Sequence, residues 1–399
     1  MVSFELSEKQ KELQARARKY AQEHIEPWVT AADLEPEPGK GFSWDVVRKG
    51  SELGFRTLSM AKKYGGEDAD ILSLCLIMEE FAAVDAGIAG VFDQCLRLNY
   101  IITDNMNDEQ RGRWLPKFTD DPDCLIAIGI TEPNHGSDTF GLVYGPGIGL
   151  QMEARRDGDD WVLNGRKDFI SNAGMAKIYF ILARTDNSVG IDKGVTCFVV
   201  GKDHPGFRFG PFRDKLGKRT EVNCELIFEN CRIPDRDRVS PVGTGIKFIA
   251  HLAKGSHVEP AAMTLGIARH AHEVSLDWAK KRVQGGKPII RHQSVQQMIA
   301  EQAMLIEATR NFIWRAALRA DEEPFQPHYS LLCKVFAAES AFTCAKLGLE
   351  IMGGHGFMKH YPMERIFRDA SAYFHTDGMN KLHLMKAAQV IGRVPPERV

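Results

Sequence analysis

Three kinds of feature are missing from this chain of 399 residues. It has no apolar run of about 18 residues, so we predict no membrane-spanning segment. Its first residues lack an apolar core with a cleavage site, so we predict no secretion signal. Its charges nearly cancel, with 51 Lys and Arg against 53 Asp and Glu and a formal net charge of −2. A chain without a basic surplus is not expected to bind nucleic acid.

Paired cysteines and common catalytic motifs are also missing. The 8 cysteines are scattered and none forms a CxxC pair, which predicts reduced core thiols and a cytoplasmic protein. The 13 histidines show no metal-ligand spacing, and there is no P-loop, HExxH or GxSxG motif. We therefore predict no metal site.

The length of 399 residues indicates more than one domain, because a single hydrophobic core stops growing near ~250–300 residues. Residues 1–123 are predicted to be an N-terminal helical domain. Within them, segment 71–88 is apolar nearly all round and should be one buried helix.

Short β-type runs follow in residues 124–238, which we predict to be a middle β domain. The pairs Asp157-Gly158 and Asn164-Gly165 are turn signals around a short strand. In residues 239–399 the helical period returns, and Gly-Gly pairs separate long helices as in an antiparallel bundle. The predicted fold class is α+β.

Two segments of the β domain carry more hydroxyl and glycine residues than packing requires. Residues 131–138 (TEPNHGSD) follow an apolar strand, and such a loop either binds a ligand or is a plain Pro/Gly turn. In residues 167–173 (KDFISNA), Phe169 and Ser171 lie two apart on a strand. They are expected to face the same side, which suits stacking plus a hydrogen bond to a flat ring, or else to belong to an ordinary strand with one core Phe.

The C-terminal part contains two more such segments. Residues 282–293 (RVQGGKPIIRHQ) place an arginine beside Gly-Gly, which suits pyrophosphate binding or an ordinary helix end. Residues 353–357 (GGHGF) and 375–380 (HTDGMN) allow the backbone to approach a phosphate or adenine. Asp377 before a glycine is otherwise a common turn residue.

Taken in order, these segments resemble the acyl-CoA dehydrogenase family of flavoproteins. The motifs that carry the resemblance are TEPNHGSD (131–138), KDFISNA (167–173), KLGKRTEVNCELIFENCRIP (215–234), RVQGGKPIIRHQ (282–293), GGHGFMKHYPMERIFRDA (353–370) and HTDGMN (375–380). The resemblance implies an N-terminal helical domain, a middle β-barrel domain and a C-terminal four-helix bundle. It also implies FAD, an acyl-CoA substrate, a homotetramer and electron transfer to an electron-transferring flavoprotein.

The resemblance also implies which residues bind FAD. Thr131 and Ser171 would hydrogen-bond the flavin, and Phe169 would cover its ring. Arg282 and Gln293 would bind the diphosphate from the partner subunit. The full implied set is Ile130, Thr131, Gly136, Ser137, Phe169, Ser171, Arg282, Gln293, Glu350, Gly353, Gly354 and Met379. Ser137 would also lie near the CoA arm.

The base position departs from the family pattern. Asp377 stands where the family usually has Glu, and its side chain is about 1.5 Å shorter. Either the substrate sits nearer, or the abstracted proton lies elsewhere, or the base has been replaced. The alternative base position of some members holds Ser256 and His257 here, and Ser cannot replace a carboxylate.

Asp93 is a second unusual acid, because the family helix at this place lines the acyl pocket. A buried carboxylate there is costly unless it is functional or hydrogen-bonded, although an Asp on a wet helix face would cost nothing. Two acids at an acyl pocket suggest 1,4-elimination on a ring, as in cyclic acyl-CoA dehydrogenases that act on cyclohex-1-ene-1-carboxyl-CoA. Phe92, Phe374 and Gly378 are expected to line that pocket.

Three other functions stay open at this point. One is ordinary α,β-dehydrogenation of a short-chain, branched or cyclohexanecarboxyl thioester. Another is a nitroalkane-oxidase-like flavin oxidase, which also carries Asp at the base position. The last is a DNA-associated family member, which the net charge of −2 disfavours.

Overall fold

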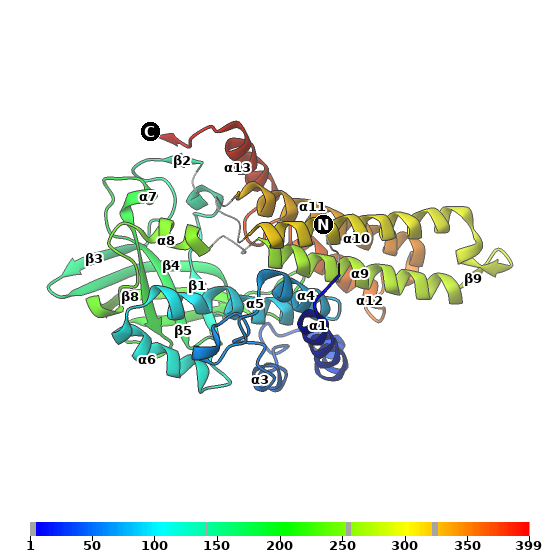
Figure 1. The fold of residues 1–399 in the computed structure, drawn as a ribbon, viewed down its shortest axis with the longest axis horizontal. Coiled ribbons are helices and arrows are strands. Elements are labelled where there is room, and N and C mark those ends of the chain that lie inside the picture. The colour runs from blue at the N-terminus through cyan, green and yellow to red at the C-terminus, as the bar shows by residue number, and fades with distance from the viewer. Residues whose placement is uncertain (1–4, 141, 253–256, 321–325, 399) are drawn as a thin grey trace.

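The computed structural model describes residues 5–140, 142–252, 257–320 and 326–398. Along the chain, a set of helices comes first, a β-sheet part follows, and a second set of helices comes last (Figure 1). The sheet lies at one end of the molecule, three long helices form an arm at the other end, and the N-terminal helices lie against their junction. The predicted α+β fold, with its order of helices, sheet and helices, is confirmed.

The N-terminal part contains the helices α1 (Glu8–Tyr20), α2 (Glu26–Leu34), α3 (Trp44–Glu52), α4 (Ile71–Ala82), α5 (Ala86–Tyr100) and α6 (Asp108–Thr119). The prediction of one helix over 71–88 is wrong, because a break separates α4 from α5. The Asp85 carboxylate accepts the Ile88 backbone N–H at 2.7 Å and so caps α5. Arg365 contacts the same carboxylate at 3.2 Å, which allows this charged cap to be buried.

The middle part contains β1 (Ile126–Gly129), β2 (Val143–Tyr144), β3 (Glu153–Asp157), β4 (Asp160–Ser171), β5 (Ile178–Arg184), α7 (Ile191–Gly194), β6 (Val195–Gly201), β7 (Phe207–Phe212) and β8 (Asn223–Pro234). The main sheet runs in the order β1-β5-β3-β4-β8-β7, and β6 pairs with β5. The turn predicted at Asp157-Gly158 joins β3 to β4. The turn predicted at Asn164-Gly165 is wrong: both residues lie inside β4, where its register with β8 shifts.

The C-terminal part contains α8 (Gly245–Leu252), α9 (Val258–Lys281), β9 (Val283–Gln284), β10 (Lys287–Pro288), α10 (Gln293–Arg319), α11 (His328–Met352), α12 (Pro362–Ala372), α13 (Asn380–Gly392) and β11 (Glu397–Arg398). The helices α9, α10 and α11 pack on one another as the arm of Figure 1, and α4 packs against α9. Within the described ranges, no helix is long and apolar enough to cross a membrane.

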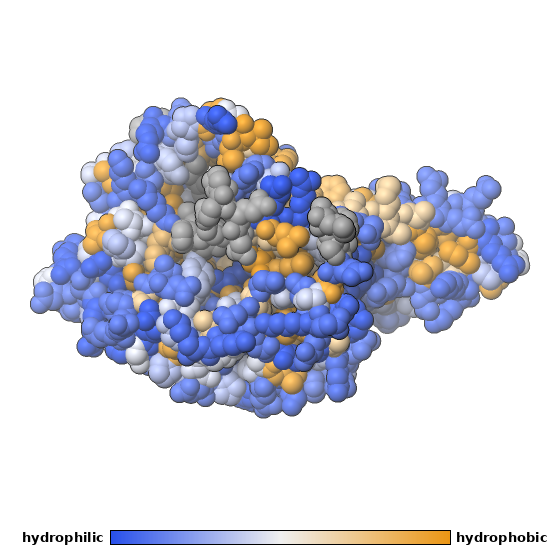
Figure 2. Space-filling view, in the orientation of Figure 1, coloured by the Kyte–Doolittle hydropathy of each residue, from blue (hydrophilic) through white to orange (hydrophobic). Residues whose placement is uncertain are grey.

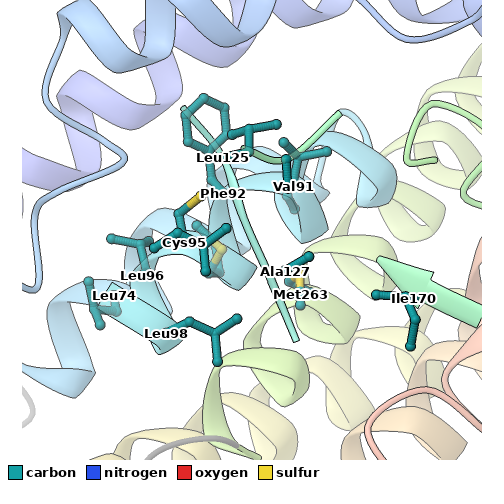
Figure 3. Packing of buried hydrophobic residues seen from close by; sticks show 14 of the residues in the cluster. Leu74, Val91, Phe92, Cys95, Leu96, Leu98, Leu125, Ala127, Ile170 and Met263 are labelled. Atoms are coloured by element: carbon teal, nitrogen blue, oxygen red, sulfur yellow. The ribbon is translucent and has the colours of Figure 1, made fainter. Parts of the chain in front are cut away.

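The apolar core continues from the N-terminal helices into both other parts. In Figure 3, Phe92 and Cys95 of α5 lie beside Leu125 and Ala127 at β1, and Met263 of α9 lies nearby. All eight cysteines are buried and unpaired, as expected for core thiols. The helix α5 therefore lies where the sheet meets the arm, and a cavity lies at this junction.

Candidate active site

A cavity of about 660 Å³ lies at this junction. One side, the β wall, consists of Ile130, Thr131, Phe169 and Ser171 at the ends of β1 and β4. Another part of the lining, the helical wall, consists of Asp93 and Arg97 on α5 and Asp377 before α13. Predicted site residues that line the cavity are Asp93, Ile130, Thr131, Gly136, Ser137, Phe169, Ser171, Asp377, Gly378 and Met379.

Phe169 is the most exposed element of the β wall. Its side chain is 61% exposed, and its backbone adopts φ 60°, which is unusual for a bulky residue. The Asp168 carboxylate accepts the Phe169 N–H at 2.7 Å and pairs with Arg213 at 2.5 Å. Phe169 and Ser171 both line the cavity, but not through simple strand alternation, because the register of β4 is irregular between Lys167 and Ile170.

A buried lysine supports the β wall from behind. Lys167 Nζ donates to the Ile130 carbonyl at 3.1 Å and to Glu132 Oε1 at 2.8 Å. The Glu132 carboxylate in turn accepts the backbone N–H groups of Gln151 and Met152 at 2.7 and 2.9 Å. A buried ion pair with these extra hydrogen bonds fixes the backbone on either side of Thr131.

The helical wall carries a chain of charges. Arg97 Nε lies 2.7 Å from Asp93 Oδ2, and Arg97 Nη1 lies 2.9 Å from Asp377 Oδ1. Asp93 and Arg97 are four residues apart on α5 and so lie on one face. The second contact joins α5 to a loop 280 residues later in the chain.

The two carboxyl groups of this wall differ in acidity. Burial alone would raise the pKa of Asp377, but the positive charges of Arg97, Lys218 and Lys334 together outweigh it, Arg97 most strongly, and hold that pKa below its ordinary value. Burial raises the pKa of Asp93 to about 7, against the opposing effect of Arg97. Near neutral pH, Asp377 is therefore ionised, whereas Asp93 is present in both its protonated and its ionised form. Because both acids contact one guanidinium, they titrate as a coupled pair.

The two aromatic residues predicted for the pocket lie elsewhere. Phe92 packs against Tyr20 and Phe81 in the N-terminal core. Since α5 turns about 100° per residue, the rotation that brings Asp93 to the cavity carries Phe92 away from it. Phe374 packs against Phe342, with ring centroids 5.0 Å apart. The prediction that Phe92 and Phe374 narrow the pocket is therefore corrected.

The sequence matches three family models in this same order. They are the N-terminal domain of acyl-CoA dehydrogenase at residues 7–121, the middle domain at 127–231 and the C-terminal domain at 243–392. The chain belongs to the acyl-CoA dehydrogenase family.

Relatives of known name span nearly the whole chain. The short/branched chain specific acyl-CoA dehydrogenase of Rattus norvegicus is 32% identical over 95% of this chain and 84% of its own. Among solved structures, butyryl-CoA dehydrogenase from Megasphaera elsdenii has a TM-score of 0.90 at 31% identity, with 98% and 100% of the chains covered. A glutaryl-coenzyme A dehydrogenase complex has a TM-score of 0.89 at 27% identity, covering 100% of this chain and 98% of that one.

This acyl-CoA dehydrogenase family member is an oxidoreductase, and its cofactor is FAD. The β wall fits a flavin, because Phe169 exposes an apolar ring to the cavity. Thr131 and Ser171 add hydroxyl groups on the same wall. Apolar ring surface with a few hydroxyls suits a flat heteroaromatic group that needs both stacking and hydrogen bonds.

The other predicted cofactor residues lie at a second cavity, of about 620 Å³. Arg282, Glu350, Gly353 and Gly354 line it, whereas Gln293 begins α10 close by in sequence and lies outside its lining. Met263 of α9 lines the first cavity, and Arg282 follows the end of the same helix 19 residues later, a distance of about 29 Å. One chain therefore does not bring both groups of residues together.

Sequence reasoning missed Glu259, in the first turn of α9. Its side chain is buried, and burial together with Asp93 raises its pKa to about 8. A glutamate one turn before the cavity residue Met263 gives no distinctive sequence signal. Of the alternative base position, Ser256 lies outside the described residues. The neighbouring His257 packs against His383 in a tilted arrangement, with ring centroids 4.6 Å apart.

Proposed function

We propose that the protein removes a proton and a hydride from the acyl group of a CoA thioester, with Asp377 as the base. The observation that carries this proposal is an ionised carboxylate in the same cavity as a wall that fits a flavin. A thioester acidifies the C–H bonds next to it, so a positioned carboxylate is sufficient as a general base. FAD, when bound, supplies the acceptor for the hydride.

Arg97 has two effects on this base. Its positive charge keeps Asp377 ionised at neutral pH, which a base requires before it can accept a proton. Its contact at 2.9 Å also restrains the carboxylate, and positioning matters because proton transfer depends on sub-ångström geometry. A short, well-restrained Asp thereby replaces the longer Glu of the family pattern.

The finer proposal concerns a ring substrate, cyclohex-1-ene-1-carboxyl-CoA. Its γ carbon would lose the proton, the ring carbon on the other side of the thioester-bearing carbon would lose the hydride, and a conjugated diene would result. Asp93 supports this proposal, because a second carboxyl group with a pKa near 7 lines the same cavity. The expected narrowing by Phe92 and Phe374 does not support it, so the two acids alone carry the ring assignment.

The experiment compares four thioesters by anaerobic bleaching of the bound flavin. Butyryl-, isobutyryl-, cyclohexanecarboxyl- and cyclohex-1-ene-1-carboxyl-CoA are each mixed with the holoprotein, and products are identified by mass and ultraviolet absorbance. The ring proposal expects the cyclohexenyl thioester to react fastest and to give a diene. It also expects Asp93→Asn to slow that reaction by at least about a hundredfold, the lower end of the range for loss of an acid–base group.

A matched control separates chemistry from the loss of a buried acid. Asp369 is another buried carboxyl group with a pKa raised to about 7, and it lies outside the cavity lining. Asp369→Asn should leave the cyclohexenyl rate close to that of the wild type once the flavin content is equal. Unchanged cyclohexenyl turnover in Asp93→Asn would sink the two-acid proposal and leave Asp377 as the only base.

The second candidate is ordinary α,β-dehydrogenation of a short or branched acyl group. Relatives at 31–32% identity favour it, including isobutyryl-CoA dehydrogenase of Dictyostelium discoideum and the short-chain specific enzyme of Megasphaera elsdenii. In the thioester panel, this function gives the fastest bleaching with butyryl- or isobutyryl-CoA and little dependence on Asp93.

We also propose a homotetramer that passes electrons to an electron-transferring flavoprotein. The second cavity supports assembly, because its cofactor residues lie too far from the β wall to act within one chain. Figure 2 shows apolar surface on the helical arm, where Met304 and Leu318 of α10 are both 63% exposed. Light scattering should give about four times the chain mass, and Arg282→Ala should lower FAD retention. A monomer that holds FAD normally would contradict the proposal.

A further inference from the structure

The loop that carries Asp377 has a strained backbone. Asp377 and Gly378 follow each other with φ angles of 56° and 92°. Glycine adopts this left-handed region freely, and aspartate adopts it more often than most other residues but still at a cost that surrounding contacts must offset. The conformation determines where the Asp377 carboxylate points, so the contacts that hold the loop also aim the carboxylate.

Lys334 of α11 makes three such contacts. Its Nζ donates to the Tyr373 carbonyl at 2.7 Å, to the Gly378 carbonyl at 2.8 Å and to Asn380 Oδ1 at 2.8 Å. The first acceptor precedes Asp377 and the other two follow it, so one ammonium group joins both ends of the loop. A lysine ammonium has three donors, and all three are used here.

Burial shows how strongly this arrangement is specified. Lys334 is fully buried, and burying a charged amine is costly unless hydrogen bonds compensate. Burial lowers the pKa of Lys334 to about 8, while the negative charges of Asp377 and Glu339 oppose that shift. Replacing Lys334 by an apolar residue would leave three polar acceptors without their donor.

His383 of α13 holds the same loop from the other side. Its Nε2 donates to the Asp377 carbonyl at 2.8 Å. Its ring approaches Gly378 so closely that an added Cβ would lie 2.7 Å from it. The loop is thus held between Lys334 and His383, and the Asp377 side chain is left to extend toward Arg97.

We propose that Lys334 is a positioning residue for the base: it closes the loop of residues 373–380 and thereby aims the Asp377 carboxylate into the cavity. This inference rests on the proposed function, because it assumes that Asp377 takes the proton. Lys334 itself does not line the cavity and touches neither substrate nor cofactor.

The charges around Asp377 affect the pH dependence of the flavin-reduction rate. A lysine with a purely structural role would leave this pH dependence unchanged. Arg97, Lys218 and Lys334 lower its pKa. Asp93 and Glu259 are the acids coupled to it, and His383 faces it from α13. Removing the Lys334 charge should therefore move the acid limb of the flavin-reduction rate to higher pH, whereas Lys334→Arg should leave that limb in place.

The experiment measures flavin reduction by stopped flow in holoproteins Lys334→Met and Lys334→Arg, with whichever thioester of the panel reduces the wild type fastest. We expect Lys334→Met to lower the limiting reduction rate at least tenfold, with thioester Kd changed less than threefold and the acid limb shifted upward. Lys334→Arg should recover part of the rate. A Lys334→Met protein that reduces flavin at the wild-type rate with an unshifted pH profile would overturn the proposal.

Three further variants keep the result decisive. Ile313→Ala, in the core of α10, should lower thermal stability without changing the reduction rate per bound flavin. If Lys334→Met does not fold, Asn380→Ala removes one of the three contacts and should slow reduction severalfold at normal thioester affinity. An unchanged rate in Asn380→Ala would then count against the proposal. Asp377→Asn separates the two hypotheses, because activity in that variant refutes the proposed base whatever Lys334 does.

Discussion

The two walls of the cavity use buried lysines in different ways. Behind the β wall, Lys167 is paired with the Glu132 carboxylate at 2.8 Å. Behind the helical wall, Lys334 donates to two backbone carbonyls and to Asn380, all of which are uncharged. The β wall presents an exposed aromatic ring and hydroxyls, whereas the helical wall presents Asp93, Arg97 and Asp377.

This difference indicates that the two walls have different functions. On the β wall the charges are paired behind the surface, so the surface itself suits a flat cofactor. On the helical wall, Arg97 and Asp377 line the cavity and Asp93 is buried beside Arg97, so these charges lie close to where a substrate would bind. Changes on the helical wall should therefore affect rates, and changes on the β wall should affect stability and cofactor binding.

Asp377→Asn tests the helical wall with the largest expected effect. Asn cannot accept the proton, and loss of a general base lowers rates by about 10²–10⁴. Stopped-flow bleaching with the best thioester measures the effect, and FAD content should stay near that of the wild type. If this variant bleaches the flavin at the wild-type rate, the helical wall does not supply the base.

Lys167→Met tests the β wall through stability. It leaves Glu132 buried without its cation, which costs about 3–5 kcal/mol, and thermal unfolding of the holoprotein should show a lower Tm. The double variant with Glu132→Leu should regain part of the loss, because neither charge then remains. The comparison of the walls fails if Lys167→Met slows flavin reduction, per bound FAD, more than Lys334→Met does.

Asp93→Asn gives a smaller, pH-dependent effect. The pKa of Asp93 is about 7 in the folded protein and about 3.9 when unfolded. The folded state therefore binds more protons between these values, so stability contributed by Asp93 falls as pH rises from about 4 to 7. We compare the Tm difference, variant minus wild type, at two pH values. This difference should be more positive at pH 8 than at pH 5 for Asp93→Asn. Equal differences at both pH values would show that Asp93 does not titrate in this range.

Phe169→Ala should have the smallest effect. Loss of one aromatic contact is worth about 0.5–1.5 kcal/mol, which corresponds to FAD binding weakened by about 2- to 13-fold. Fluorescence titration of the apoprotein with FAD measures it. With FAD saturating, the reduction rate should stay within about twofold, because a contact that holds the cofactor equally in the ground state and the transition state does not change the rate of the chemical step. A large rate loss at saturating FAD would show that Phe169 acts in the reaction step and not only in cofactor binding.

The sequence allowed prediction of much of this arrangement, because its motifs are local. Thr131, Ser171 and Asp377 each lie in a short pattern that can be recognised without a structure. Helix rotation is not local: one residue of rotation decides whether Asp93 or Phe92 reaches the cavity, and the expectation included both. The break between α4 and α5 was also hidden, because the capping Asp85 is compensated by Arg365, 280 residues away.

Glu259 and Lys334 show a further limit of sequence reasoning. Each is a charged residue in a largely apolar helical segment, and such residues usually lie on a solvated face. Their surroundings come from distant parts of the chain: the Asp377 loop accepts hydrogen bonds from Lys334, and the nearby acid Asp93 raises the pKa of Glu259 further. No spacing rule connects these positions, so only the folded chain shows the relation.

The three hydrogen bonds of Lys334 have one more consequence. Thioesters acylate free amines, and an amine with a pKa near 8 would be a good nucleophile if a substrate could reach it. Lys334 is fully buried and outside the cavity lining, and the Asp377 loop covers its ammonium group. The protein can therefore keep this amine near an activated acyl group without becoming acylated at that position.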